Sequence, residues 1–231
     1  MLAPPDANAA RPVLDYAPAD RDLTYMQVVW RYVLTSPYMW LISVANLAVY
    51  VLRWAQVTWG PTFLQEDKGF TKVQAGWLAF GSEIGGMVGA LVAGLAADRL
   101  FGGRAGRVCV LAMGLMAVAV YAFRVTPRGA PVVAGALFVT MGFFLYIPQM
   151  LIAAMAMNLG TKRASAAAVG LTGLIGYLSQ IVTGVGIGHM VDRHGWGAAF
   201  HLMAGCAVLT LVLMAFTWNV GAHPHAAGDH R

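Results

Sequence analysis

Six long apolar runs dominate this chain, and they restrict its possible folds more than any other feature. We place them at about residues 38–63, 73–97, 107–125, 130–158, 166–190 and 198–219. Each is close to the roughly 20 residues that an α-helix needs to cross a bilayer. Charged residues make up only 11% of the 231 residues, whereas roughly 25% is usual for a soluble domain. The sequence therefore predicts an all-α membrane protein with six spanning helices.

The segments outside these runs suggest a simple domain plan. Residues 1–22 are rich in Pro, Ala and Asp, so we expect a disordered cytoplasmic linker. Residues 23–37 carry apolar side chains at helical spacing, which predicts an amphipathic helix on the membrane surface. The six-helix unit then covers 38–220, and residues 221–231 form a polar cytoplasmic tail. Lys and Arg are more frequent on the N-terminal side of the membrane, which predicts that both termini face the cytoplasm.

Glycines in the second run are spaced for close helix packing. Gly81, Gly85 and Gly89 follow one another at intervals of four residues, so they share one face of a helix. Small residues on such a face let two helix backbones approach each other in a membrane. The sequence therefore predicts a tight contact between the second spanning helix and another helix.

Arg53 is the one charged residue between positions 41 and 64. An arginine at the centre of a bilayer costs about 2.5–3.5 kcal/mol on insertion scales, so it is retained where it faces a partner, a cavity or a ligand. Its planar fork suits phosphate and carboxylate groups, which accept two parallel hydrogen bonds. Two interpretations stay open at this point. Arg53 binds an anion, or it is a structural arginine that snorkels or pairs with Glu83, the acidic residue of the second run.

No pattern in the sequence indicates an enzyme. A Walker loop, a nucleophile elbow and an HExxH motif are all missing. Cys109 and Cys206 lie within apolar runs, unlike the cysteines of a disulfide or zinc framework. The net charge of +5 is modest and fits basic loops better than nucleic-acid binding. We therefore expect no catalytic residue, no cofactor, no metal and no nucleic-acid partner, with the lipid bilayer as the surroundings.

The loop after the second run has the sequence GLAADRLFGGRAGR, residues 94–107. It resembles the G-x-x-x-D-R-x-G-R-type loop of the major facilitator superfamily, in which an acidic residue and a basic cluster form a latch at the cytoplasmic face. The resemblance implies a conformational latch made of Asp98, Arg99, Arg104 and Arg107. Ordinary helix ends with basic anchors are the alternative interpretation.

A closer resemblance covers about residues 20–220. The stretches NLAVYVLRWAQVTWGPTFL (46–64), FFLYIPQMLIAAMAMNL (143–159) and AAAVGLTGLIGYLSQIVTGVGIGHMVDRHGW (166–196) resemble the seventh, tenth and eleventh helices of the organophosphate:phosphate antiporters. This group includes the glycerol-3-phosphate and hexose-6-phosphate transporters and a hexose-phosphate sensor. Its members have twelve helices in two similar halves. The resemblance therefore implies the C-terminal, six-helix half of a major facilitator superfamily fold.

The resemblance also implies a substrate site. Arg53 corresponds to the phosphate-binding arginine of the C-terminal half, and Tyr50, Tyr146 and Tyr177 correspond to aromatic residues that line the pore. Glu83 corresponds to an acidic residue on the eighth helix and is the expected charge partner of Arg53. For the three tyrosines, packing or anchoring at the membrane interface is the alternative interpretation.

The implied function is secondary active transport of an organic phosphate in exchange for inorganic phosphate, by alternating access, in a bacterial inner membrane. Two alternatives stay open: a membrane sensor of hexose phosphate that acts on a signalling partner, and a half-protein that is inactive alone. A separate N-terminal half or a second copy is the expected partner. Thr58 stands where glycerol-3-phosphate transporters have an aspartate, and Ser179 and Gln180 stand where hexose-phosphate transporters have an ion pair. The particular organic phosphate therefore stays open as well.

Overall fold

The computed structural model describes residues 23–218, except for the side chains of residues 161 and 162. The predicted linker at 1–22 and tail at 221–231 lie outside the described residues. All regular elements within the described range are helical. The α-helices are α1 (Tyr25–Val29), α2 (Pro37–Trp54), α3 (Gly60–Glu66), α4 (Lys72–Leu95), α5 (Ala105–Val125), α6 (Pro131–Leu159), α7 (Thr161–Ile181), α8 (Ile187–His194) and α9 (Trp196–Ala215). Four π-helical turns connect or extend them: η2 (Trp30–Leu34), η3 (Ala55–Trp59), η4 (Ala96–Leu100) and η5 (Val182–Gly186).

Within residues 23–218, six helical segments are long and apolar enough to cross a membrane, which confirms the predicted fold class. They are Pro37–Glu66, Lys72–Leu100, Ala105–Val125, Pro131–Leu159, Arg163–His194 and Trp196–Ala215. Several spans continue through a π-helical turn, so that α2, η3 and α3 form one span and α7, η5 and α8 form another. The fourth span, α6, runs through Pro148 without ending, although proline lacks the N–H that a helix interior uses.

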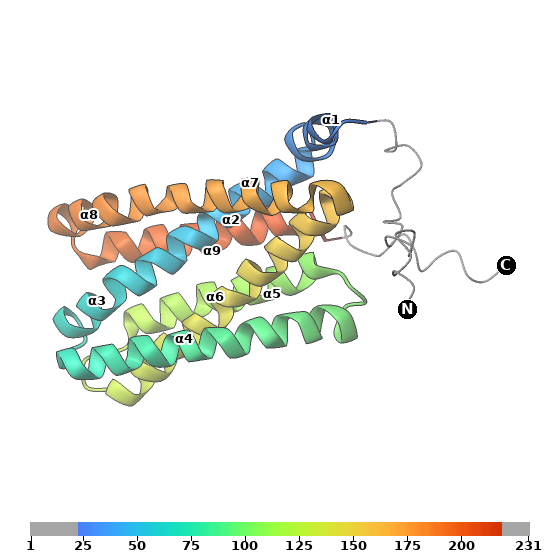
Figure 1. The fold of residues 1–231 in the computed structure, drawn as a ribbon. Coiled ribbons are helices and arrows are strands. Elements are labelled where there is room, and N and C mark those ends of the chain that lie inside the picture. The colour runs from blue at the N-terminus through green and yellow to red at the C-terminus, as the bar shows by residue number, and fades with distance from the viewer. Residues whose placement is uncertain (1–22, 219–231) are drawn as a thin grey trace, which may run out of the picture.

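The spans form one bundle whose connections lie at its two ends (Figure 1). The main packing pairs are α4 with α6, α2 with α7, and α5 with α9. In Figure 1, α2 and α6 run diagonally across the neighbouring helices. α1 lies at the end of the bundle where α4 connects to α5 and α6 connects to α7. The segment predicted as an amphipathic helix is helical from Tyr25 to Leu34, and its location on a membrane surface stays a prediction.

The contact between α4 and α6 depends on glycines, as their spacing predicted. A Cβ atom at Gly89 would lie 2.2 Å from the backbone oxygen of Phe143, and one at Gly85 would lie 3.0 Å from the oxygen of Val139. On the facing helix, a Cβ atom at Gly142 would lie 2.3 Å from the backbone oxygen of Ser82. The distances at Gly89 and Gly142 are too short for a side chain, and the distance at Gly85 is tight, so the close approach of the two backbones depends on glycine in both helices.

Lys68, between α3 and α4, is only 5% exposed and binds the end of α5. Its Nζ donates to the backbone oxygens of Thr126 at 2.6 Å and Arg124 at 3.3 Å. The carboxylate of Asp67 lies 3.3 Å from the same nitrogen. Because the last carbonyl groups of a helix lack partners within the helix and carry partial negative charge, the ammonium group caps α5 and ties two loops together.

We predict that Lys68→Met lowers the free energy of unfolding by about 1.5–3 kcal/mol, because buried acceptors lose hydrogen bonds from a charged donor. Methionine retains most of the apolar stem, so the change isolates the ammonium group. The measurement is denaturant unfolding of the purified chain in detergent. Lys72→Met is the matched control, since Lys72 is exposed at the start of α4. Equal stability of the two variants would contradict the capping role.

Candidate functional site

Arg53 lies in the last turn of α2, two residues before the π-helical turn η3. Its side chain is 22% exposed. The π-helical turn widens the helix locally, a feature that is frequent at functional sites. Tyr50 lies one turn before Arg53 on the same helix face. The end of α2 therefore presents an arginine and a tyrosine in the same direction.

Three helices bring four polar side chains together, and we call this set the Arg53 cluster: Arg53 from α2, Glu83 from α4, and Tyr146 and Gln149 from α6. Arg53 Nη1 donates to Gln149 Oε1 at 2.6 Å, and Nη2 donates to the Tyr146 hydroxyl at 2.9 Å. Nη2 also lies 3.8 Å from Glu83 Oε2. The Tyr146 hydroxyl donates to that same carboxylate oxygen. The tyrosine thus bridges the guanidinium and the carboxylate.

Tyr146 reaches this position because α4 has a glycine opposite it. A Cβ atom at Gly86 would lie 2.4 Å from Cδ2 of the Tyr146 ring, so the ring packs directly on the α4 backbone. The Arg53 Cζ atom lies 4.6 Å from the centre of this ring, within the range of a cation–π interaction. The ring therefore fixes the guanidinium group by stacking as well as by hydrogen bonding.

Tyr50 and Tyr177 form a second aromatic contact beside the Arg53 cluster. Their ring centres are 5.3 Å apart with an interplanar angle of 72°, an edge-to-face arrangement that aromatic pairs favour. Tyr50 approaches α7 closely, since a Cβ atom at Gly176 would lie 3.2 Å from its Cδ2. Its hydroxyl lies near Gln149 and Tyr177. The structure thus gathers all the residues that the resemblance assigned to the substrate site.

The four predicted latch residues lie at the connection between α4 and α5. Asp98 and Arg99 are in η4, Arg104 precedes α5, and Arg107 is in its first turn. Arg107 Nε donates to the backbone oxygen of Trp218 at 3.4 Å, and its Cζ lies 5.3 Å from the Trp218 ring centre. Within residues 23–218, no ion pair joins Asp98 to any of these arginines. The latch stays a prediction.

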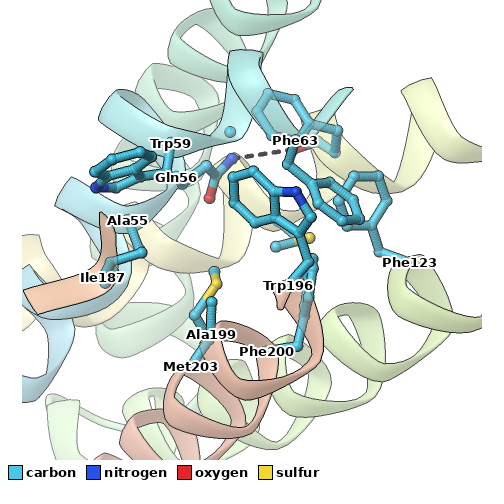
Figure 2. Close-up of a pocket in the computed structure, with 13 residues that line it drawn as sticks. Ala55, Gln56, Trp59, Phe63, Phe123, Ile187, Trp196, Ala199, Phe200 and Met203 are labelled. Carbon is cyan, nitrogen blue, oxygen red and sulfur yellow. Dashed lines mark hydrogen bonds between the residues drawn. The ribbon is translucent and has the colours of Figure 1, made fainter. Parts of the chain in front are cut away.

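Gln56 lines two cavities of different size. The first has a volume of about 30 Å³ and is lined almost entirely by carbon atoms. Figure 2 shows aromatic rings around it, among them those of Trp59, Phe63 and Trp196. The second, of about 190 Å³, is lined by Glu83 among others. Among the residues of the Arg53 cluster, Glu83 alone lines the second cavity, and Arg53 itself lines neither.

Gln56 itself joins three helices beside both cavities. Its Nε2 donates to Ser82 Oγ of α4 at 2.6 Å and to the backbone oxygen of Phe138 of α6 at 3.1 Å. The dashed line at Gln56 in Figure 2 marks the second of these hydrogen bonds. Ser82 precedes Glu83, so this amide anchors the part of α4 that carries the carboxylate. Gln56 was not predicted as a site residue.

Gln149, which makes the shortest hydrogen bond to Arg53 given above, was also not predicted as a site residue. A signal was present, because Gln149 is a polar residue inside an apolar run, three positions after Tyr146. Polar side chains in such runs are uncommon and face protein or water rather than lipid. The partner of Gln149 was not readable from the sequence, since Arg53 is 96 positions away.

Residues 3–184 match the Major Facilitator Superfamily. The chain therefore belongs to this superfamily, which confirms the family predicted from the loop at 94–107. It is 36% identical over 203 residues to the glycerol-3-phosphate transporter of Bacillus subtilis (strain 168), covering 87% of this chain and 46% of that relative. It is 34% identical over 201 residues to a probable hexose phosphate transport protein of Chlamydia pneumoniae, covering 87% of this chain and 44% of that relative.

A third relative differs in its named role. The chain is 33% identical over 192 residues to the membrane sensor protein UhpC of Escherichia coli (strain K12), covering 83% of this chain and 44% of that relative. The chain thus spans about half the length of the curated relatives it matches. Two of these relatives are named for phosphate esters, glycerol-3-phosphate and hexose phosphate, in agreement with the predicted resemblance.

Proposed function

We propose that this chain is the C-terminal half of a secondary transporter that exchanges an organic phosphate for inorganic phosphate by alternating access. The observation that carries the proposal is Arg53, a guanidinium group on a spanning helix that is held by tyrosine and glutamine side chains and, within residues 23–218, pairs with a single carboxylate, that of Glu83. The similarity to proteins named for glycerol-3-phosphate and hexose phosphate supports phosphate esters as the substrate class. We place the protein in a bacterial inner membrane, with both termini in the cytoplasm.

In this proposal, Glu83 is the resting partner of Arg53. The two groups are 3.8 Å apart, and the Glu83 side chain is 44% exposed, so the pair lies at the edge of the protein where an anion has access. A half-exposed ion pair contributes only about 1 kcal/mol or less. A phosphate dianion with bidentate geometry therefore displaces the carboxylate from Arg53. The Tyr146 hydroxyl then donates to a phosphate oxygen in place of Glu83, and the hydroxyls of Tyr50 and Tyr177 line the site.

The Arg53 cluster forms one wall of the proposed site. The two least buried spans are Lys72–Leu100, with 22% of its apolar window buried, and Arg163–His194, with 28%. These spans carry Glu83 and Tyr177, so they flank Arg53 on both sides. The exposed apolar faces of these two spans lie beside a charged site. They support the proposal that a separate N-terminal half or a second copy forms the opposing wall. Rocking of the two walls about the bound phosphate would expose it to each side of the membrane in turn.

A sensor is the second candidate, because the chain is also similar to UhpC, a protein named as a membrane sensor. A sensor that binds hexose phosphate and acts on a signalling partner needs the same Arg53 cluster as a transporter. The two candidates differ in flux, because a sensor has no need to release its ligand on the other side of the membrane.

We predict that the complete transporter, made of this chain and its opposing half, exchanges a phosphate ester for inorganic phosphate. Proteoliposomes that contain the chain with its opposing half and are loaded with inorganic phosphate are expected to take up labelled glycerol-3-phosphate or glucose-6-phosphate. Vesicles without internal phosphate are the control. The isolated chain, as a demonstrated monomer, is expected to give no flux, because one wall cannot enclose the substrate. Binding without flux by the complete protein would favour the sensor, and flux from the monomer would contradict the assignment as a half.

A further inference from the structure

We propose that Gln149 is a positioning residue that orients the guanidinium group of Arg53 and keeps it available to an anion. This inference rests on the proposed function, because it concerns how Arg53 binds phosphate. The observation is the hydrogen bond of 2.6 Å from Arg53 Nη1 to Gln149 Oε1. Neither the sequence patterns nor the resemblance assigned a role to this residue.

Gln149 and Tyr146 hold the two ends of the same guanidinium group. They are three residues apart on α6 and therefore share a helix face. Gln149 accepts from Nη1, Tyr146 accepts from Nη2, and the Tyr146 ring stacks on Cζ. Contacts to both nitrogens and to the central carbon set the direction of the fork and its plane. Arginine has further N–H donors that these two bonds do not use, and these remain for an anion.

The Gln149 side chain is uncharged, and this property is as important as its position. An amide oxygen accepts a strong hydrogen bond from a guanidinium group without neutralising it. A carboxylate at the same place would give Arg53 two anionic neighbours, because Glu83 already lies 3.8 Å from Nη2. Charges interact strongly away from bulk water, so a second carboxylate would oppose a phosphate. Gln149 thus fixes the geometry of Arg53, and Glu83 alone supplies the displaceable negative charge.

The amide also connects Arg53 to the aromatic pair beside it. The Tyr50 hydroxyl neighbours both Gln149 and Tyr177. Hydrogen bonds therefore run from Glu83 through Tyr146 and Arg53 to Gln149, and the Tyr50 hydroxyl lies near that amide.

The test is equilibrium binding of inorganic phosphate to the 231-residue chain in lipid nanodiscs. Gln149→Glu preserves the shape and adds a charge, and it is expected to raise the Kd for phosphate by about tenfold or more. Gln149→Leu removes the acceptor and is expected to raise the Kd by roughly tenfold. Gln65→Glu is the matched control, because it is the same isosteric substitution at a site on α3. There the Gln65 Nε2 donates to the backbone oxygen of Pro61. Its Kd is expected to be unchanged.

Two further readouts separate positioning from packing. The thermal midpoint of Gln149→Glu and Gln149→Leu is expected to stay near that of the unchanged chain while the Kd rises. In an Arg53→Lys background, Gln149→Leu is expected to cause no further loss of binding, because the fork that Gln149 orients is already missing. Additive losses, or binding that falls only in step with the thermal midpoint, would overturn the positioning role.

The outcome also distinguishes this inference from the proposed function. Normal phosphate binding by both Gln149 variants, with weaker binding by Arg53→Lys, would overturn the role of Gln149 and leave the proposed function standing. No saturable phosphate binding, either by the unchanged chain or by the chain together with its opposing half, would overturn both.

Discussion

Arg53→Lys is expected to weaken phosphate binding by roughly 10- to 150-fold, corresponding to the loss of about 1.5–3 kcal/mol from hydrogen bonds to a charged group. Lysine retains the positive charge but has a single ammonium group in place of the planar fork. It cannot contact Gln149 and Tyr146 with two separate nitrogens, as Arg53 does, while also presenting a bidentate edge to phosphate. The measurement is equilibrium binding of inorganic phosphate in nanodiscs, with uptake of a labelled phosphate ester by the complete transporter as a second readout.

Arg31→Lys is the control for that prediction. Arg31 is exposed in η2, outside the six spans, and the same chemical change there is expected to leave phosphate binding unaltered. Unaltered binding by both variants would show that charge alone suffices at position 53. The bidentate site would then be wrong, even if the protein still moved phosphate esters.

Gly89→Ala is expected to reduce the free energy of unfolding by about 1–3 kcal/mol, the usual cost of overpacking a tight contact. The new methyl group would lie 2.2 Å from the backbone oxygen of Phe143. Since backbone cannot rotate away as a side chain does, α4 and α6 must separate. These two helices carry Glu83 and Tyr146, so the bridge between Arg53 and Glu83 is expected to open as well. The measurements are the denaturation midpoint and phosphate affinity of the purified chain.

Gly94→Ala is a matched control on the same helix. No atom lies within 4 Å of a Cβ placed there, and alanine favours helix over glycine by about 1 kcal/mol. This variant is expected to be as stable as the unchanged chain or slightly more so. Equal destabilisation by both substitutions would mean that the α4–α6 contact is looser than the structure indicates.

The fold was largely predictable because bilayer chemistry leaves few options. Six apolar runs of spanning length gave six spans, with ends that differ from the predicted ones by a few residues. The row of Gly81, Gly85 and Gly89 predicted a close helix contact, and all three glycines face α6. The π-helical turns were not predicted. They replace ordinary helical turns without changing the apolar pattern, so they leave no clear trace in the sequence.

The candidate site was predictable in its charges and less so in its neutral groups. Arg53 and Glu83 are conspicuous because each is an isolated charge in an apolar run, and isolated charges in a membrane need partners. Gln149 lies closer to Arg53 than Glu83 does, but a neutral amide has less need of a partner than a charge has, and its partner depends on how α2 crosses α6. Lys68 illustrates a further limit. In the sequence it is a loop charge that helps to orient the protein, whereas in the structure it caps α5.

The most direct test of the central claim is a distance between Arg53 and bound phosphate. Solid-state NMR on the ¹⁵N-arginine-labelled chain in bilayers measures the separation between guanidinium nitrogens and the ³¹P of glycerol-3-phosphate, and the Arg53→Lys variant assigns the signal. Bidentate binding predicts a nitrogen–phosphorus distance of about 4 Å or less, which disappears in that variant. A short distance that survives in Arg53→Lys would place the phosphate at another arginine and contradict the account.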